Sequence, residues 1–176
     1  GVLKRLLTIN AILVVNKSDL IKGKLNNKFK KYEHVLISIK KDSNLNKLIT
    51  KINPEIIYTH HSNDLNVDHR ITHQAVFTAC RPEPGAIVKK IYCFEVPSST
   101  EWQAPVAETP FIPNTFVDIS NTLEIKLAAL KAYESEMKPW PHSRSIQAVE
   151  CLAYWRGASA GFEAAEAFSL SRNLVL

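Results

Sequence analysis

The chain has 176 residues, enough for one ordinary domain with a hydrophobic core. Its composition is 45% hydrophobic and 22% charged with a net charge of +5, which is typical of a globular protein and excludes a disordered one. No apolar run approaches the roughly 20 residues that a spanning helix needs, so we expect no membrane partner. The three cysteines form no close pair, which is typical of reduced thiols and predicts a cytoplasmic protein.

The charge is unevenly distributed along the chain. Residues 1–52 carry twelve Lys and Arg against three Asp and Glu, whereas residues 53–176 carry ten against fourteen. A basic segment can bind nucleic acid, but these lysines are scattered between apolar positions. We interpret them as a solvated face and expect no nucleic-acid partner. The change in composition predicts two segments, 1–52 and 53–176.

Short apolar runs alternate with helical patterns in the first part of the chain. Strands are expected at 11–15, 34–39 and 56–59, where apolar and β-branched residues cluster. A helix is expected over 45–52, with its cap at 42–44. This alternation predicts an α/β fold with a mostly parallel, Rossmann-like sheet flanked by helices.

The second part of the chain continues the pattern with longer helices. A proline-rich loop is expected over 97–113, and 164–170 fits either a strand or a helical turn. The remaining elements expected are a helix at 69–79, strands at 86–94 and 115–119, and helices at 120–137 and 145–158.

Histidines and carboxylates concentrate just after the expected strand 56–59. In open parallel sheets, ligands bind beyond the carboxyl ends of the strands. His69 and His73 are four residues apart, so they lie on one helix face as two metal ligands could. Asp68 could orient a neighbouring imidazole. Spacing alone leaves open a second interpretation, in which Asp68 caps the helix and the histidines are simply exposed.

Six blocks of sequence resemble, in order, the LmbE-like branch of the PIG-L deacetylase family. The resemblance covers about residues 53–172, and its first block reads Tyr58-Thr-His-His-Ser-Asn-Asp-Leu-Asn-Val-Asp-His-Arg70 at its centre. The blocks span residues 56–76, 79–82, 94–102, 131–137, 141–145 and 155–157.

The resemblance implies a zinc-dependent hydrolase that removes acetyl groups from N-acetylated sugar conjugates. It assigns His69 as a zinc ligand and Asp68 as an orienting carboxylate. Asn66 stands where many members have a histidine, and its amide can donate a hydrogen bond to an oxyanion but cannot titrate. His142 and Arg144 match a late Pro-His-x-Arg segment and would contact the substrate. A helix-capping role is the alternative for these two residues.

One family motif has no counterpart in the sequence. The early His-Pro-Asp-Asp-Glu motif, which would supply two further zinc ligands and the general base, does not occur. One histidine does not hold a catalytic zinc ion. Unless His60, His61 or His73 substitutes, we therefore expect impaired activity and doubtful zinc occupancy.

The first segment resembles a different family. Asn16-Lys17-Ser18-Asp19 follows the strand 11–15 in the pattern with which GTPases read guanine, and 37–48 looks like the later guanine loop and its helix. Residues 9–52 thus resemble the end of the G domain in MnmE-type tRNA-modification GTPases. Asn16, Lys17 and Asp19 would contact the base. No Gly-x-x-x-x-Gly-Lys-Ser/Thr phosphate loop occurs, so we expect no GTP hydrolysis.

Three hypotheses of function follow from these patterns. The chain is a PIG-L/LmbE-like N-deacetylase, a non-catalytic fused α/β domain, or a guanine-nucleotide-binding remnant. The first ranks highest for descent and the second for the activity of this chain. Homo-oligomerisation stays open.

Overall fold

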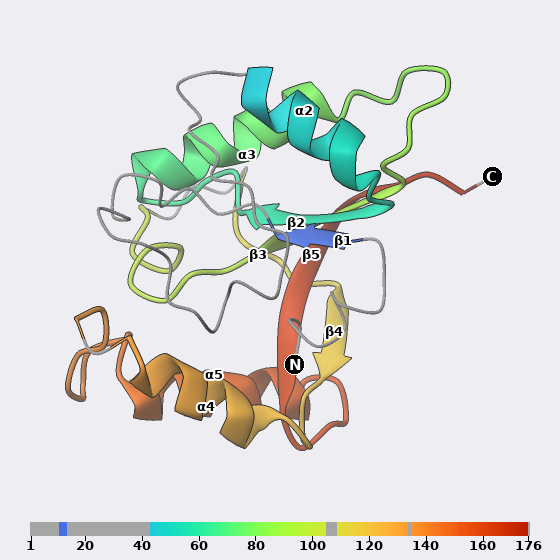
Figure 1. Cartoon of the computed structure of the whole chain (residues 1–176). Coiled ribbons are helices and arrows are strands. Elements are labelled where there is room, and N and C mark those ends of the chain that lie inside the picture. Colours follow the sequence, from blue (N-terminus) through green and yellow to red (C-terminus); the bar gives the residue numbers. More distant parts are fainter. Residues whose placement is uncertain (1–10, 14–42, 105–108, 134, 176) are drawn as a thin grey trace.

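The computed structural model describes residues 11–13, 43–104, 109–133 and 135–175. Within these ranges the chain forms strands and helices that alternate for most of its length (Figure 1). The strands are β1 (Ala11–Leu13), β2 (Ile56–His60), β3 (Lys90–Phe94), β4 (Thr115–Asp118) and β5 (Ala165–Asn173). The helices are α2 (Ser43–Ile52), α3 (Val67–Ala79), α4 (Leu123–Lys131) and α5 (Ile146–Ala158).

The strands form one mixed sheet in the order β1-β2-β3-β5-β4. β1 pairs with β2 and β2 with β3 in parallel, whereas β5 runs antiparallel to both β3 and β4. The predicted α/β class and flanking helices are confirmed, but a mostly parallel sheet is not. The reason lies in the two helices between β4 and β5. They return the chain to the end at which β4 stopped, so that Ala165 pairs with Asp118 and β5 runs the opposite way.

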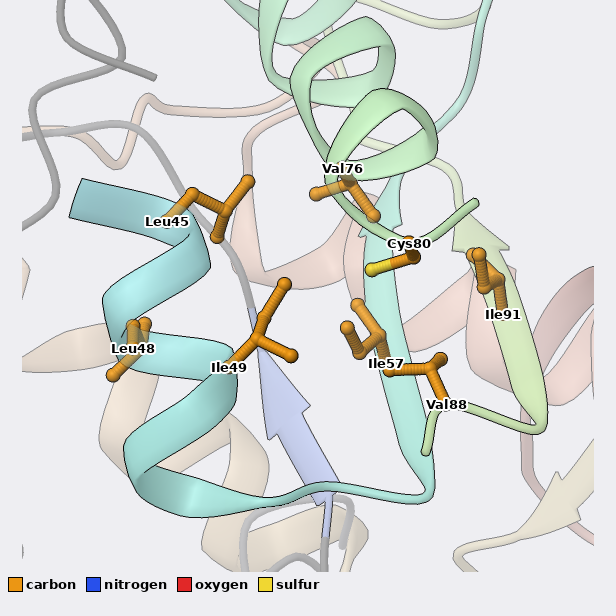
Figure 2. Packing of buried hydrophobic residues seen from close by; sticks show 8 residues of the cluster. All are labelled: Leu45, Leu48, Ile49, Ile57, Val76, Cys80, Val88 and Ile91. Carbon is orange, nitrogen blue, oxygen red and sulfur yellow. The ribbon is translucent and has the colours of Figure 1, made fainter. Parts of the chain in front are cut away.

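The first hydrophobic core lies between the sheet and the helices α2 and α3. Figure 2 shows Leu45 and Ile49 of α2 pointing towards α3 and the strand β2. Ile57, Val76 and Ile91 are fully buried there. Burial of each such aliphatic side chain contributes about 1.5–3 kcal/mol. The apolar spacing expected for the helix 45–52 is confirmed by Leu45, Leu48 and Ile49, which all belong to this core.

The second hydrophobic core lies on the other side of the sheet, where α4 and α5 pack near β4 and β5 (Figure 1). Its buried members are Ile119, Leu123, Leu127, Val149, Ala153 and Ala164. Gly157 permits the close approach of α5 to the following chain, since a Cβ there would lie 2.7 Å from Ala164 Cα. The helix pair α4 and α5, rather than one crossover helix, therefore covers β4 and β5 on this side of the sheet.

Several expected boundaries move in the structure. The strand expected at 86–94 begins at Lys90, because the amides of Lys89 and Lys90 both bond the Glu55 carbonyl before regular pairing starts. The helix expected at 120–137 ends at Lys131, where the bond from the Tyr133 amide to the Leu130 carbonyl tightens the last turn.

Two further expectations have different outcomes. Residues 164–170, which fitted a strand or a helical turn, lie largely in β5. The strand expected at 34–39 lies outside the described residues. Among the helices that the structure describes, none combines the length and apolarity needed to cross a membrane.

Candidate functional site

The candidate site lies where β2 ends and α3 begins. His60 is the last residue of β2, and residues 61–66 form the connection to the helix. Asn66 caps α3, because its side-chain oxygen accepts a hydrogen bond of 2.9 Å from the Asp68 amide. The site therefore sits at the carboxyl end of a parallel strand pair, as the sequence predicts.

Asp64 is the buried centre of this site and is fully inaccessible to solvent. Its carboxylate accepts hydrogen bonds from the Asn66 amide at 2.9 Å, from Thr100 Oγ1 at 2.7 Å and from Ser99 Oγ. His69 Nδ1 lies 3.0 Å from Asp64 Oδ1. Burial raises the pKa of Asp64, but the hydrogen bonds outweigh it and hold the pKa well below its usual range. Asp64 is consequently a carboxylate anion that only accepts hydrogen bonds.

This anion selects the tautomer of the neutral His69 ring. Because an ionised carboxylate has no proton to give, Nδ1 of His69 must donate in the bond to Asp64. In the neutral imidazole the lone pair then resides on Nε2. The His69 side chain is 12% exposed, whereas that of Asp64 is 0% exposed. A carboxylate that orients an imidazole in this way is the arrangement found behind metal-binding and proton-transferring histidines.

His60 lies directly against His69. The two imidazole rings stack with centroids 4.0 Å apart and planes 18° from parallel. His60 is 2% exposed, and its Nδ1 has no hydrogen-bond partner among the described residues. The pKa of His60 is lowered to about 3, first by burial and then by the nearby His69 and His73, while Asp64 acts in the opposite direction. His60 is thus a neutral ring at neutral pH.

The two other histidines of the segment contact backbone carbonyl oxygens through their ring nitrogens. His61 Nε2 lies 3.1 Å from the Thr109 carbonyl oxygen. His73 Nδ1 lies 2.9 Å from the His60 carbonyl oxygen, and the His73 ring stacks on Phe77. Burial lowers the pKa of His73. Although His69 and His73 are four residues apart on α3, their Nδ1 atoms contact different partners.

The loop after β3, residues 95–101, joins Asp64 to the C-terminal part of the chain. Ser99 and Thr100 donate to Asp64 from this loop. Glu101 closes it, because its carboxylate accepts from the Ser98 amide at 2.6 Å. On the other side, Arg144 Nε donates to Ser98 Oγ. Sequence reasoning missed Asp64, Ser99 and Thr100, and the available signal was an aspartate five residues before His69 on the same connection.

The structure brings His142 and Arg144 into contact with each other and with residues 98–102. His142 Nδ1 accepts a 3.0 Å hydrogen bond from the Arg144 amide, and the His142 and Trp102 rings pack in a T-shaped arrangement with centroids 5.3 Å apart. Arg144 forms an ion pair of 2.9 Å with Glu136. The cap of α5 is Ser145, whose side chain accepts from the Ala148 amide. The connection of Arg144 to the site runs through the loop 95–101.

Two other predicted site residues have structural contacts in α3. Asp68 is exposed in the first turn of the helix, where its negative charge interacts favourably with the helix dipole, and the carboxylate on His69 is Asp64. Asn66 uses its side-chain oxygen as the helix cap. Asn16, Lys17 and Asp19 lie outside the described residues.

The described residues do not assemble a complete zinc site. A catalytic zinc ion takes three protein ligands. Among the residues with described positions, no group of three or more His, Cys, Asp or Glu side chains is placed to hold one. His69 fits the role of one ligand, with its lone pair on Nε2 and Asp64 behind it. The donor set is therefore one histidine, and it supports no catalytic step through a metal.

A cavity of about 180 Å³ opens beside the loop 95–101. Its wall combines carboxylates and a hydroxyl with apolar side chains, namely Glu95, Glu101, Ser143, Val96, Pro97, Ala148 and Leu152. Glu95 is held by Arg156, whose Nε and Nη2 each donate a hydrogen bond of 2.8 Å to its carboxylate. The buried Ser143 Oγ has no hydrogen-bond partner among the described residues. The cavity thus lies on one side of a loop that also contacts Asp64.

Comparisons with known proteins establish the fold. No protein-family model and no curated protein matches the chain. Among solved structures, N,N'-diacetylchitobiose deacetylase from Pyrococcus horikoshii is similar with a TM-score of 0.56 and 18% identity, over 77% of this chain and 52% of that one. The 4-carboxy-2-hydroxymuconate hydratase GalB from Pseudomonas putida is similar with a TM-score of 0.59 and 19% identity, over 80% and 61%.

A third solved structure matches over more of its length. The conserved protein TT1542 from Thermus thermophilus has a TM-score of 0.61 and 15% identity, over 94% of this chain and 83% of that one. These matches are consistent with the PIG-L/LmbE fold. The chain spans about half the length of the deacetylase and 61% of the hydratase. The three similar structures lend no support to the GTPase resemblance of residues 9–52, which stays a prediction.

Proposed function

We propose that this chain carries the histidine–carboxylate part of a hydrolase site of the PIG-L/LmbE type, acting on the acetamide of N-acetylated sugar conjugates. The observation that carries the proposal is the buried Asp64 anion, which holds the His69 imidazole with its lone pair on Nε2 at the carboxyl end of β2. The similarity in fold to a chitobiose deacetylase supports the choice of substrate class.

The reaction adds water to an amide. The water oxygen bonds to the acetyl carbon, the carbon–nitrogen bond breaks, and the amine leaves with a proton, so that acetate and an amino sugar are formed. Nε2 of His69 is the atom that would accept a proton from the water, and Asp64 would stabilise the positive charge that this proton brings to the ring. In the family, zinc activates the water. The described residues of this chain supply one candidate ligand for it, His69.

The cavity beside the loop 95–101 is the proposed place for the sugar. Carboxylates and hydroxyls bond sugar hydroxyls, and apolar side chains cover the ring faces. The cavity offers both, together with the Ser143 hydroxyl, for which the described part of the chain supplies no hydrogen-bond partner. Because Ser98 and Glu101 belong to the same loop as Ser99 and Thr100, a sugar bound here would lie against the segment that holds Asp64.

A hydratase is the second candidate function. The structure of GalB, a hydratase, is similar to this chain in fold. Hydration and amide hydrolysis share their first requirement, which is a group that activates or orients water. The histidine–carboxylate pair meets this requirement for either reaction, so the nature of the acceptor bond distinguishes the two candidates.

Acetate release tests the proposal. The full chain is incubated with N,N'-diacetylchitobiose, with and without added Zn²⁺, and bound zinc is measured by elemental analysis. We expect acetate release that is lost in His69→Ala and retained in Cys151→Ser, since Cys151 is exposed on α5. If neither the wild type nor the Cys151→Ser control releases acetate at any zinc level, the hydrolase proposal fails and the non-catalytic α/β domain stands. Water addition to a 2-hydroxymuconate-type diene tests the second candidate.

A further inference from the structure

The stacked rings of His60 and His69 join two elements of the candidate site. His60 ends β2, and His69 lies in the first turns of α3. Their ring centroids are 4.0 Å apart. The His60 ring is itself supported on a second aromatic ring, because Phe94 at the end of β3 lies 4.8 Å from it. The His69 imidazole therefore rests on a surface that two neighbouring strands provide.

The face of the His60 ring makes this contact, and its nitrogens do not. The Nδ1 atom is buried without a hydrogen-bond partner among the described residues. The bond that joins His60 to His73 uses the backbone carbonyl and leaves the imidazole uninvolved. A buried polar atom without a partner costs free energy. The His60 side chain accordingly contributes the face of its ring, against which the His69 ring stacks.

The stacking geometry also decides against His60 as a second metal ligand. A metal ion binds an imidazole nitrogen in the plane of the ring, at about 2.0–2.1 Å. The planes of His60 and His69 are only 18° from parallel and are separated by the stack. An ion in the plane of His69 would therefore lie well out of the plane of His60, away from its lone pair. The two rings cannot share one ion in this arrangement.

We propose that His60 is a positioning residue, an aromatic platform that keeps the His69 imidazole turned towards Asp64 with its proton on Nδ1. The inference rests on the proposed role of His69 in the site. Asp64 fixes the ring at one edge, and His60 prevents it from tilting out of that hydrogen bond. Together they leave Nε2 as the lone-pair nitrogen in a single orientation.

The test reads the tautomer of His69 directly. Two-bond ¹H–¹⁵N correlation spectra of the labelled full chain distinguish a protonated from an unprotonated ring nitrogen. The spectra are compared for the wild type, His60→Phe and His60→Leu. Phenylalanine keeps an aromatic face without nitrogens. Leucine fills a similar volume without an aromatic face, so both variants conserve the burial that folding needs.

We expect the wild type and His60→Phe to show His69 predominantly in the Nδ1–H form, with the same small population of other ring states. In His60→Leu the population of other ring states should rise roughly threefold to tenfold, as the loss of an aromatic pair implies. An unchanged tautomer in His60→Leu would overturn the platform. A change of equal size in His60→Phe would also overturn it, because the ring nitrogens would then carry the effect.

The experiment is independent of acetate release. A chain without deacetylase activity can still show the Nδ1–H form of His69 and its dependence on residue 60. In that case the proposed function fails and the positioning role stands. If the wild type releases acetate and His60→Leu loses this activity with an unchanged His69 tautomer, the proposed function stands and the positioning role fails.

Discussion

Asp64 is the residue on which the candidate site depends, because its buried carboxylate accepts hydrogen bonds from four surrounding groups. Two hydroxyls, a backbone amide and an imidazole meet on its two oxygens. These groups come from the β2–α3 connection, from α3 itself and from the loop 95–101. A single charge thus ties together three segments. The exposed Asp68, only four residues away, has no comparable position.

Asp64→Asn should therefore destabilise the protein strongly, whereas Asp68→Asn should not. The amide of asparagine has nearly the same shape, but it carries no charge and presents two donors to hydroxyls and an imidazole that also donate. Loss of charged hydrogen bonds costs about 1.5–3 kcal/mol each, so we expect a decrease of about 2–4 kcal/mol in the free energy of unfolding. For Asp68→Asn, a lost helix-dipole interaction costs at most about 1 kcal/mol. Urea unfolding of both variants measures the difference, and equal effects would contradict the assignment.

Stability should fall as the pH is lowered from 6.5 to 5. The pKa values of His60 and His73 lie below the ordinary 6.5 in the folded state, so the unfolded chain binds protons that the folded chain refuses. A group of this kind costs about 1.4 kcal/mol per pH unit below its unfolded pKa. Asp64 affects stability in a lower pH range. Because its pKa is lowered in the folded state, its contribution to stability is lost only as the pH falls through the ordinary carboxyl range and below it.

Urea midpoints at pH 7.5, 6.5 and 5 measure this effect. We expect a loss of about 1–2 kcal/mol between pH 6.5 and 5 for each histidine that stays neutral. His60→Phe removes one of the two groups and should flatten the slope. A variant with the slope of the wild type would show that His60 takes up its proton in the folded protein.

At the scale of elements, the two C-terminal helices begin differently. Ser145 is 3% exposed, and its side chain caps α5 by accepting a hydrogen bond from the Ala148 amide at 3.0 Å. Thr122 precedes α4 without a side-chain cap bond, and its hydroxyl donates to the Ile119 carbonyl. The start of α5 is therefore specified by its own sequence, whereas the start of α4 depends on packing of Leu123 and Leu127.

Ser145→Ala should accordingly cost more stability than Thr122→Ala. Removal of a side-chain cap costs about 0.5–2 kcal/mol, and the buried position of Ser145 favours the upper part of that range. Thr122→Ala loses only one hydroxyl bond and is the matched control. Thermal unfolding followed by circular dichroism compares the two. The view of α4 as packing-dependent would be wrong if Thr122→Ala proved the more harmful change.

At the scale of the whole molecule, local patterns predicted the elements better than their arrangement. The spacing of Leu45, Leu48 and Ile49 identifies the buried face of α2, and the expected strand and helix on either side of the connection 61–66 are present as β2 and α3. The direction of β5 is set by a helix pair and by the pairing of Ala165 with Asp118. Such long-range pairing leaves no periodic signal in the strand itself. The same limit hid the contact between Asp64 and Ser99, which are 35 residues apart.

Guanine nucleotide binding is one of the three hypotheses drawn from the sequence, and its residues lie outside the part of the chain that the structure describes. The motif from Asn16 to Asp19 would contact only the base, because no phosphate loop occurs in the sequence. Phosphate contacts supply much of the affinity in nucleotide sites, so we expect no change in melting temperature with GDP at millimolar concentration. A ligand at 100 times its Kd would stabilise the protein by about 2.7 kcal/mol and would be seen. A shift that vanishes in Asp19→Ala would establish the guanine site, whereas a shift that persists in this variant would reflect binding elsewhere.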